Sequence, residues 1–99
     1  KFREYVESHI LDDISLDDLA GALGYSKSKL YRELKEVTEY TPIDLVNLVR
    51  LHKAVDLMTV EHQNITEAAF NSGFSSPSYF SRTFLKYYHM RPKDYLKRS

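Results

Sequence analysis

The chain has 99 residues, which is enough for one ordinary domain and too few for a multi-domain enzyme. With 42% hydrophobic and 28% charged residues, it has the composition of a folded globular protein rather than of a disordered segment. The absence of cysteine excludes a disulfide scaffold, a cysteine-ligated zinc site and a thiol nucleophile. No apolar run approaches the roughly 18 to 20 residues that span a bilayer, and the first residues do not resemble a signal peptide.

The charge is balanced overall but unevenly distributed, because 14 Lys and Arg residues match 14 Asp and Glu residues. Residues 1–22 hold two basic and six acidic side chains, a net charge of −4, and residues 23–58 have a net charge of +1. Residues 75–99 hold six basic side chains and one acidic side chain, a net charge of +5. This asymmetry favours an anionic partner for the C-terminal part.

Apolar residues recur at helical spacing along the whole chain, which predicts an all-α fold. In chain order the first two expected helices cover residues 2–10 and 15–23. A third follows the glycine at position 24 and extends to about residue 38. The others cover residues 42–58, 64–72 and 76–88, with a short helical turn at 92–97. Ser15 with Asp18, and Asn64 with Glu67, have the spacing of capping boxes. The polar positions of 42–58 step by three and wind around the helix, so we interpret this helix as a bridge packed on more than one side.

An internal repeat organises these helices. A shift of 49 residues places Ser15 on Asn64, Ala20 on Ala69 and Gly24 on Gly73. After a one-residue insertion at Ser76 the shift is 50, and it pairs Ser28 with Ser78, Leu30 with Phe80, Arg32 with Arg82, Leu34 with Phe84 and Pro42 with Pro92. Two copies of one supersecondary unit therefore flank the bridging helix.

Each copy has the pattern of a helix-turn-helix, the first at about residues 15–38 and the second at about 64–88. A small residue, Ala20 or Ala69, lets the second helix approach the first closely. The glycine four residues later supplies the positive φ at which the chain reverses. Leu30, Leu34 and Val37 share one face of the second helix in the first copy, which leaves the opposite face open.

These motifs resemble the DNA-binding domain of the AraC/XylS family of bacterial transcription regulators over essentially all 99 residues. The resemblance is carried by Leu19-Ala20, Gly24-Tyr25-Ser26, Leu30, Arg32, Pro42, Arg50, Ala54, the run from Gly73 to Phe84, Pro92 and Tyr95. It implies seven helices, with two helix-turn-helix subdomains joined by a long linker helix at about residues 42–58. It further implies that two recognition helices enter successive major grooves of double-stranded DNA.

The resemblance also implies a cytoplasmic regulator, most often an activator, that needs no cofactor and makes no membrane contact through this domain. RNA polymerase is the expected protein partner. We expect the isolated domain to be a monomer and the full-length protein to be a dimer, with a sensing domain or a hybrid two-component assembly on the N-terminal side. Two departures from the family stand out: Glu39 and His89 occupy positions where glycine usually follows each recognition helix, and Phe70-Asn71 replace smaller or aliphatic residues.

The candidate DNA-binding residues lie on the two recognition helices, and they are Lys27, Ser28, Tyr31, Arg32, Lys35, Ser78, Tyr79, Ser81, Arg82 and Lys86. The forked guanidinium groups of Arg32 and Arg82 suit a guanine edge or a phosphate, the alternative being a solvated or ion-paired arginine. The matching family positions of Ser28, Tyr31, Ser78 and Ser81 reach bases or backbone, the alternative being a solvated face. The three lysines suit phosphates. Tyr79 fits either packing or a contact with the DNA backbone. Arg50 fits a structural role that ties the subdomains together, the alternative being a phosphate contact.

Other chemistry finds little support. Capping and helix-dipole complementarity account for the acidic pairs Asp12-Asp13 and Asp17-Asp18. The histidines at 9, 52, 62 and 89 lack the spacing of metal ligands, and no phosphate-binding loop or nucleophile elbow occurs. We therefore expect no metal, no cofactor and no enzyme activity. The remaining alternative is a helical protein-interaction module whose recognition faces have lost DNA binding.

Overall fold

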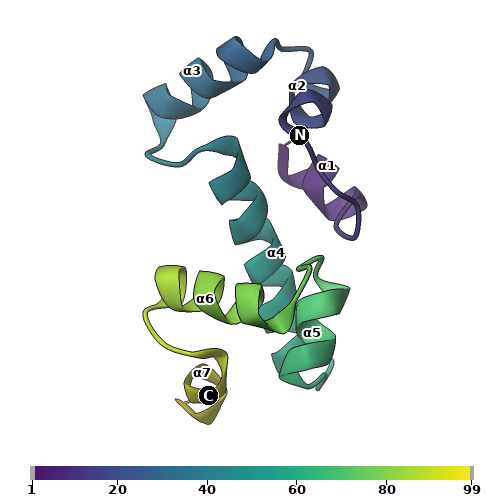
Figure 1. Cartoon of the computed structure of the whole chain (residues 1–99), viewed down its shortest axis with the longest axis vertical. Coiled ribbons are helices and arrows are strands. Elements are labelled where there is room, and N and C mark those ends of the chain that lie inside the picture. The colour runs from purple at the N-terminus through teal and green to yellow at the C-terminus, as the bar shows by residue number, and fades with distance from the viewer. Residues whose placement is uncertain (1, 99) are drawn as a thin grey trace. The chain divides into compact units, whose positions relative to one another are not determined.

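The computed structural model describes residues 2–98, which form seven α-helices and no strand, so the prediction of an all-α fold is confirmed (Figure 1). The helices are α1 (Phe2–Ser8), α2 (Leu16–Leu23), α3 (Lys27–Val37), α4 (Pro42–Thr59), α5 (Ile65–Asn71), α6 (Pro77–Tyr88) and α7 (Pro92–Arg98). None of these helices is both long enough and apolar enough to cross a membrane. The chain divides into two compact units, Lys1–Val49 (unit 1) and Arg50–Ser99 (unit 2).

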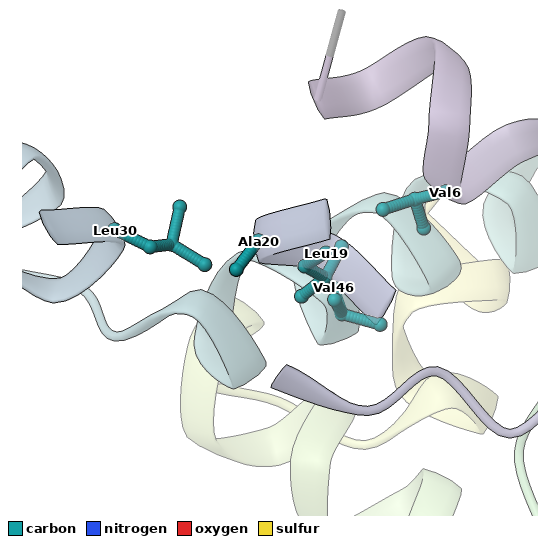
Figure 2. Packing of buried hydrophobic residues seen from close by; sticks show 5 residues of the cluster. All are labelled: Val6, Leu19, Ala20, Leu30 and Val46. Atoms are coloured by element: carbon teal, nitrogen blue, oxygen red, sulfur yellow. The ribbon is translucent and has the colours of Figure 1, made fainter. Parts of the chain in front are cut away.

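The core of unit 1 gathers side chains from four helices. Figure 2 shows Val6 of α1, Leu19 and Ala20 of α2, Leu30 of α3 and Val46 of α4, all of them buried. Phe2, Tyr5, Leu23 and Leu34 are among the half-buried residues that pack around this cluster. Because α2 contacts both α1 and α3, burial of its apolar face holds the first helix pair of the repeat together.

The turn between α2 and α3 is fixed by backbone geometry. Gly24 has φ +73°, in the left-handed region. The amide of the next residue, Tyr25, donates to the carbonyl oxygen of Ala20 at 2.8 Å. A Cβ atom on Gly24 would meet nothing within 4 Å, so backbone conformation rather than space requires glycine here. At the other end of α2, Ser15 and Asp18 form the predicted capping box.

Unit 2 repeats this turn with the same hydrogen bond. Gly73 has φ +98°, and the Phe74 amide donates to the Ala69 carbonyl oxygen at 3.0 Å. The phenyl ring of Phe74 is buried and fills the corner, whereas its counterpart Tyr25 is only half-buried. Ala20 aligns with Ala69 and Gly24 with Gly73 because both units use the same hydrogen-bonded glycine turn.

The core of unit 2 is aromatic. Phe80 and Phe84 of α6 are fully buried, and Phe80 contacts Phe74 edge to face with ring centroids 5.1 Å apart. The ring centroid of Tyr95 in α7 lies 5.5 Å from that of Phe84 and 5.4 Å from that of Tyr88, and these contacts attach α7 to α6. Burial raises the pKa of the Tyr88 phenol, with smaller contributions from Tyr95 and Asp56. The neutral phenol is thus favoured, and this stabilisation is lost only as the pH rises above about 10.

The two recognition-type helices end differently. α6 ends at His89, which adopts the left-handed conformation with φ +60° even though it is not a glycine. α3 ends at Thr38 in an extended conformation, and the Thr38 hydroxyl donates to the Leu34 carbonyl oxygen at 3.1 Å. α6 therefore keeps the left-handed end that glycine usually provides, with a residue that carries a Cβ atom, whereas α3 replaces that end by a side-chain cap.

The placement of Val37 on the buried face of α3 was wrong. Its side chain is 77% exposed, whereas Leu30 on the same face is buried. Val37 is the last residue of α3, and in Figure 1 that end of α3 lies away from α2. The periodicity of the sequence continues past the point where α2 covers the helix.

We expect overpacking at the two helix contacts. Ala20→Leu and Ala69→Leu should each lower the free energy of unfolding by about 1 to 3 kcal/mol, because a buried alanine leaves no room for a larger side chain. Urea denaturation measures the effect, with Ala22→Leu on the exposed side of α2 as the control. Equal stability of the Ala20 and Ala22 variants would contradict this packing.

Replacement of His89 by glycine should raise the free energy of unfolding by up to about 1 kcal/mol, because it removes the strain of a left-handed residue with a Cβ atom. Thr38→Gly, at the end of α3, should instead destabilise, since it removes the hydroxyl cap and adds unfolded-state entropy. Thermal denaturation of the two variants should therefore shift in opposite directions. A shift of the same sign would mean that the two ends are built alike.

Candidate nucleic-acid interface

All five residues that the sequence predicts for α3 are exposed. α3 begins at the cap residue Ser26, whose hydroxyl accepts from the Lys29 amide at 3.2 Å. At 100° per residue, Ser28, Arg32 and Lys35 lie on the side opposite the buried Leu30. The exposed candidates are Lys27, Ser28, Tyr31, Arg32 and Lys35. α3 thus presents hydroxyl, phenol, guanidinium and ammonium groups to solvent.

α6 presents a similar face in unit 2. The Ser76 hydroxyl accepts from the Tyr79 amide at 3.1 Å, and Pro77 occupies the first turn, where it needs no hydrogen-bond partner. Ser78, Arg82 and Lys86 are exposed and Ser81 is half-buried. Pro77, Ser78, Ser81 and Arg82 line an open hollow of about 510 Å³. Three of the candidate residues of α6 therefore meet at one surface feature.

Tyr79 lies at the edge of this face. Its side chain is 37% exposed, and its ring tilts against Phe74 with centroids 5.8 Å apart. The Tyr79 carbonyl oxygen accepts from the buried Thr83 hydroxyl at 2.8 Å. This geometry supports packing against the corner of the turn and leaves part of the ring accessible.

One candidate cation has an acidic neighbour that the sequence did not reveal. The Lys27 Nζ lies 3.5 Å from the Asp17 Oδ1, and both side chains are largely exposed. Asp17 precedes Asp18, which is held in the capping box. Hydrogen bonds from the Ser15 amide and hydroxyl lower the pKa of Asp18, which favours the charged form of this carboxylate. The start of α3 in unit 1 therefore has negative charge beside it.

Two further lysines lie over aromatic rings. The Lys29 Nζ is 4.7 Å from the centroid of the Tyr25 ring, and the Lys86 Nζ is 5.2 Å from that of Tyr87. Such contacts hold an ammonium group loosely at a surface and leave it available to an anion. Lys29 was not among the candidates, although its position in the first turn of α3 could have identified it. Within residues 2–98 no three His, Asp or Glu side chains gather as a metal site.

The two faces share their geometry but differ in charge. Where unit 1 has Asp17, the repeat places Thr66 in unit 2. Where α3 has Lys35 and Glu36, α6 has Leu85 and Lys86. Unit 2 therefore lacks the acidic groups that accompany the face of unit 1, and one of its exposed positions is apolar.

Comparison with known proteins identifies the fold and the family. A family model described as a helix-turn-helix domain matches residues 19–98. The chain is 32% identical over 90 residues to the HTH-type transcriptional activator RhaS of Escherichia coli O157:H7, an alignment covering 91% of this chain and 32% of that protein. The chain thus spans about a third of the length of this relative.

Solved structures agree with this result. A transcriptional regulator from Chromobacterium violaceum, titled as an AraC-type DNA-binding domain-containing protein, superimposes with a TM-score of 0.84 at 27% identity, over 94% of this chain and 83% of that one. The C-terminal domain of AraT, a response regulator from Geobacillus stearothermophilus, superimposes with a TM-score of 0.84 at 28% identity, over 99% of this chain and 82% of that one. The chain belongs to the AraC/XylS family of transcription regulators.

Proposed function

We propose that this chain is the DNA-binding part of a bacterial transcription regulator and that it binds a specific sequence of double-stranded DNA through α3 and α6. The observation that carries the proposal is the repeated exposed face of hydroxyl and guanidinium groups, Ser28 and Arg32 in α3 and Ser78 and Arg82 in α6. Each face lies opposite a buried core that fixes the orientation of its helix. Serine and arginine are side chains that read base edges in the major groove.

The residues of each face have separate roles. Arg32 and Arg82 read base edges, and Ser28, Tyr31, Ser78 and Ser81 contact neighbouring bases or the backbone. Lys27, Lys35 and Lys86 neutralise phosphates, and Tyr79 packs at the turn while its exposed edge contacts the backbone. α3 and α6 enter successive major grooves, so their base contacts lie about 10 base pairs apart.

The two units contribute differently to affinity. The +5 charge of residues 75–99 draws unit 2 to the phosphates over a long range. In unit 1 the side chains of Glu33 and Glu36 on α3, together with Asp17, oppose this attraction. Unit 2 therefore supplies most of the salt-dependent binding, and unit 1 adds base reading.

The names of the relatives support a role for the whole protein. RhaS is named an activator, which supports activation as the outcome of binding, and RNA polymerase is the expected partner of an activator. AraT is titled a response regulator, which supports an output role in a two-component system. The protein acts in the cytoplasm without a cofactor or enzyme activity in this domain, and the longer protein is a dimer.

Base-reading and phosphate-binding residues should separate in a mutant series. Against a randomised duplex, Arg82→Ala and Arg32→Ala should each weaken specific binding by about 1 to 3 kcal/mol and relax the preference at one base pair. Lys86→Ala should weaken binding to all sequences alike and lower the salt slope by about one unit. Fluorescence anisotropy at two salt concentrations measures both effects, with Arg3→Ala of α1 as the control.

If both arginine variants kept full affinity and full sequence preference, α3 and α6 would not be recognition helices. If the chain instead bound a protein partner with an affinity that does not fall as salt is added, the protein-interaction module would be favoured, because apolar docking releases no counterions.

Removal of the charge of Asp17 should strengthen binding. Asp17→Asn frees Lys27 and takes away a negative group beside the start of α3, so affinity for all DNA sequences should rise about two- to fivefold, the range that surface charge interactions of up to ~1 kcal/mol allow. Thr66→Asp, the reciprocal change in unit 2, should weaken binding. DNA titrations of the two variants at low salt measure these changes in affinity. An Asp17→Asn variant that binds DNA more weakly than the wild type would contradict this electrostatic role.

The 99-residue chain should be a monomer that binds its site weakly, because its sequence carries no heptad seam and a dimer needs parts of the longer protein. Sedimentation equilibrium at micromolar concentration should give the mass of one chain. A stable dimer under these conditions would show that the domain carries its own dimerisation surface.

A further inference from the structure

Leu85 is an apolar residue on the polar face of α6. It follows Ser78 by seven residues, Ser81 by four and Arg82 by three, so all four share one side of the helix. Its side chain is 47% exposed. It therefore lies one turn beyond the residues that line the open hollow of unit 2.

The core of unit 2 does not account for this leucine. Phe80, Thr83 and Phe84 form the buried side of α6, and Phe84 and Tyr88 hold α7 through Tyr95. Leu85 lies on the other side of the helix from Phe80 and Thr83, about 140° and 160° away, and about 60° from the half-buried Tyr88. An isolated exposed leucine is common on protein surfaces, but this one interrupts a face of hydroxyl and guanidinium groups.

The repeat shows what this position does in the other unit. The counterpart of Leu85 is Lys35, an exposed cation suited to phosphate. Unit 2 is the more basic unit, yet it carries an apolar side chain where unit 1 carries a charge. An apolar side chain gains nothing from a phosphate, so Leu85 suits a different group on the DNA.

The major groove offers one prominent apolar group, the 5-methyl group of thymine. We propose that Leu85 is a specificity-determining residue that contacts the 5-methyl group of a thymine next to the base read by Arg82. Three residues of helix advance about 4.5 Å and one base pair about 3.4 Å, so the thymine lies within about two base pairs of that base. This inference rests on the proposed entry of α6 into the major groove.

The size of the effect follows from the loss of one methyl contact. Burial of a single methyl group changes affinity about fourfold, equivalent to ~0.8 kcal/mol. That change is independent of salt, whereas the contribution of a lysine at the same position would depend on salt.

The test compares thymine with uracil, which lacks only the 5-methyl group. The preferred site of the 99-residue chain is first selected from a randomised duplex, and each thymine is then replaced singly by deoxyuridine. For the wild-type chain, one replacement within about two base pairs of the Arg82-dependent position should weaken binding about fourfold. For Leu85→Ala the same replacement should have no effect, and for Val60→Ala, an exposed control, it should keep its effect.

Leu85→Lys, which introduces the side chain of Lys35, should abolish the methyl effect and raise the salt slope by about one unit. Circular dichroism melts establish that each variant is folded. A methyl effect that persists in folded Leu85→Ala overturns the inference, and so does a wild-type site without a methyl-dependent thymine in that range. In either case an Arg82→Ala variant with relaxed preference leaves the proposed function intact, whereas loss of all sequence preference in the wild type removes both.

Discussion

A single backbone hydrogen bond, repeated once, sets the geometry on which both helix pairs depend. The amide after the left-handed glycine donates to the carbonyl oxygen of a buried alanine, Tyr25 to Ala20 in unit 1 and Phe74 to Ala69 in unit 2. The bond closes the turn only when the glycine has positive φ, and the helices approach only when the alanine is small. The exposed faces of α3 and α6 follow from this, because the turn determines which side of each helix meets the core.

The same geometry carries different chemistry in the two units. Unit 1 has an ion pair between Asp17 and Lys27 at the start of α3, and a capping box that holds a second carboxylate nearby. Unit 2 has Thr66 in place of Asp17 and an aromatic core that attaches the basic helix α7. The zero net charge of the chain therefore hides two surfaces of different electrostatic character. Under the proposed function both units read bases, and the more basic unit 2 supplies more of the long-range attraction to DNA.

Most of the fold follows from patterns that act within a few residues. Helical periodicity, the Ser15 and Asn64 capping boxes and the glycine turns are local, and they predict the helices and the exposed sides of α3 and α6. The Lys27–Asp17 pair could not be predicted, because it depends on how α2 and α3 cross. Val37 was misplaced for a similar reason, since periodicity does not indicate how far α2 covers α3. Nine of the ten candidate residues are exposed, as the pattern predicts, and Ser81 is half-buried, while the contacts of all ten with DNA stay predictions.

A nuclear magnetic resonance titration of the ¹⁵N-labelled chain with its selected duplex tests directly whether α3 and α6 both contact DNA. We expect amide shifts to change most along α3 around residues 27–35 and along α6 around residues 78–86, and the amides of α1 to change little. A site on DNA that perturbs only one of these helices, or mainly the amides of α1, would contradict the claim that the repeat forms two DNA-reading faces.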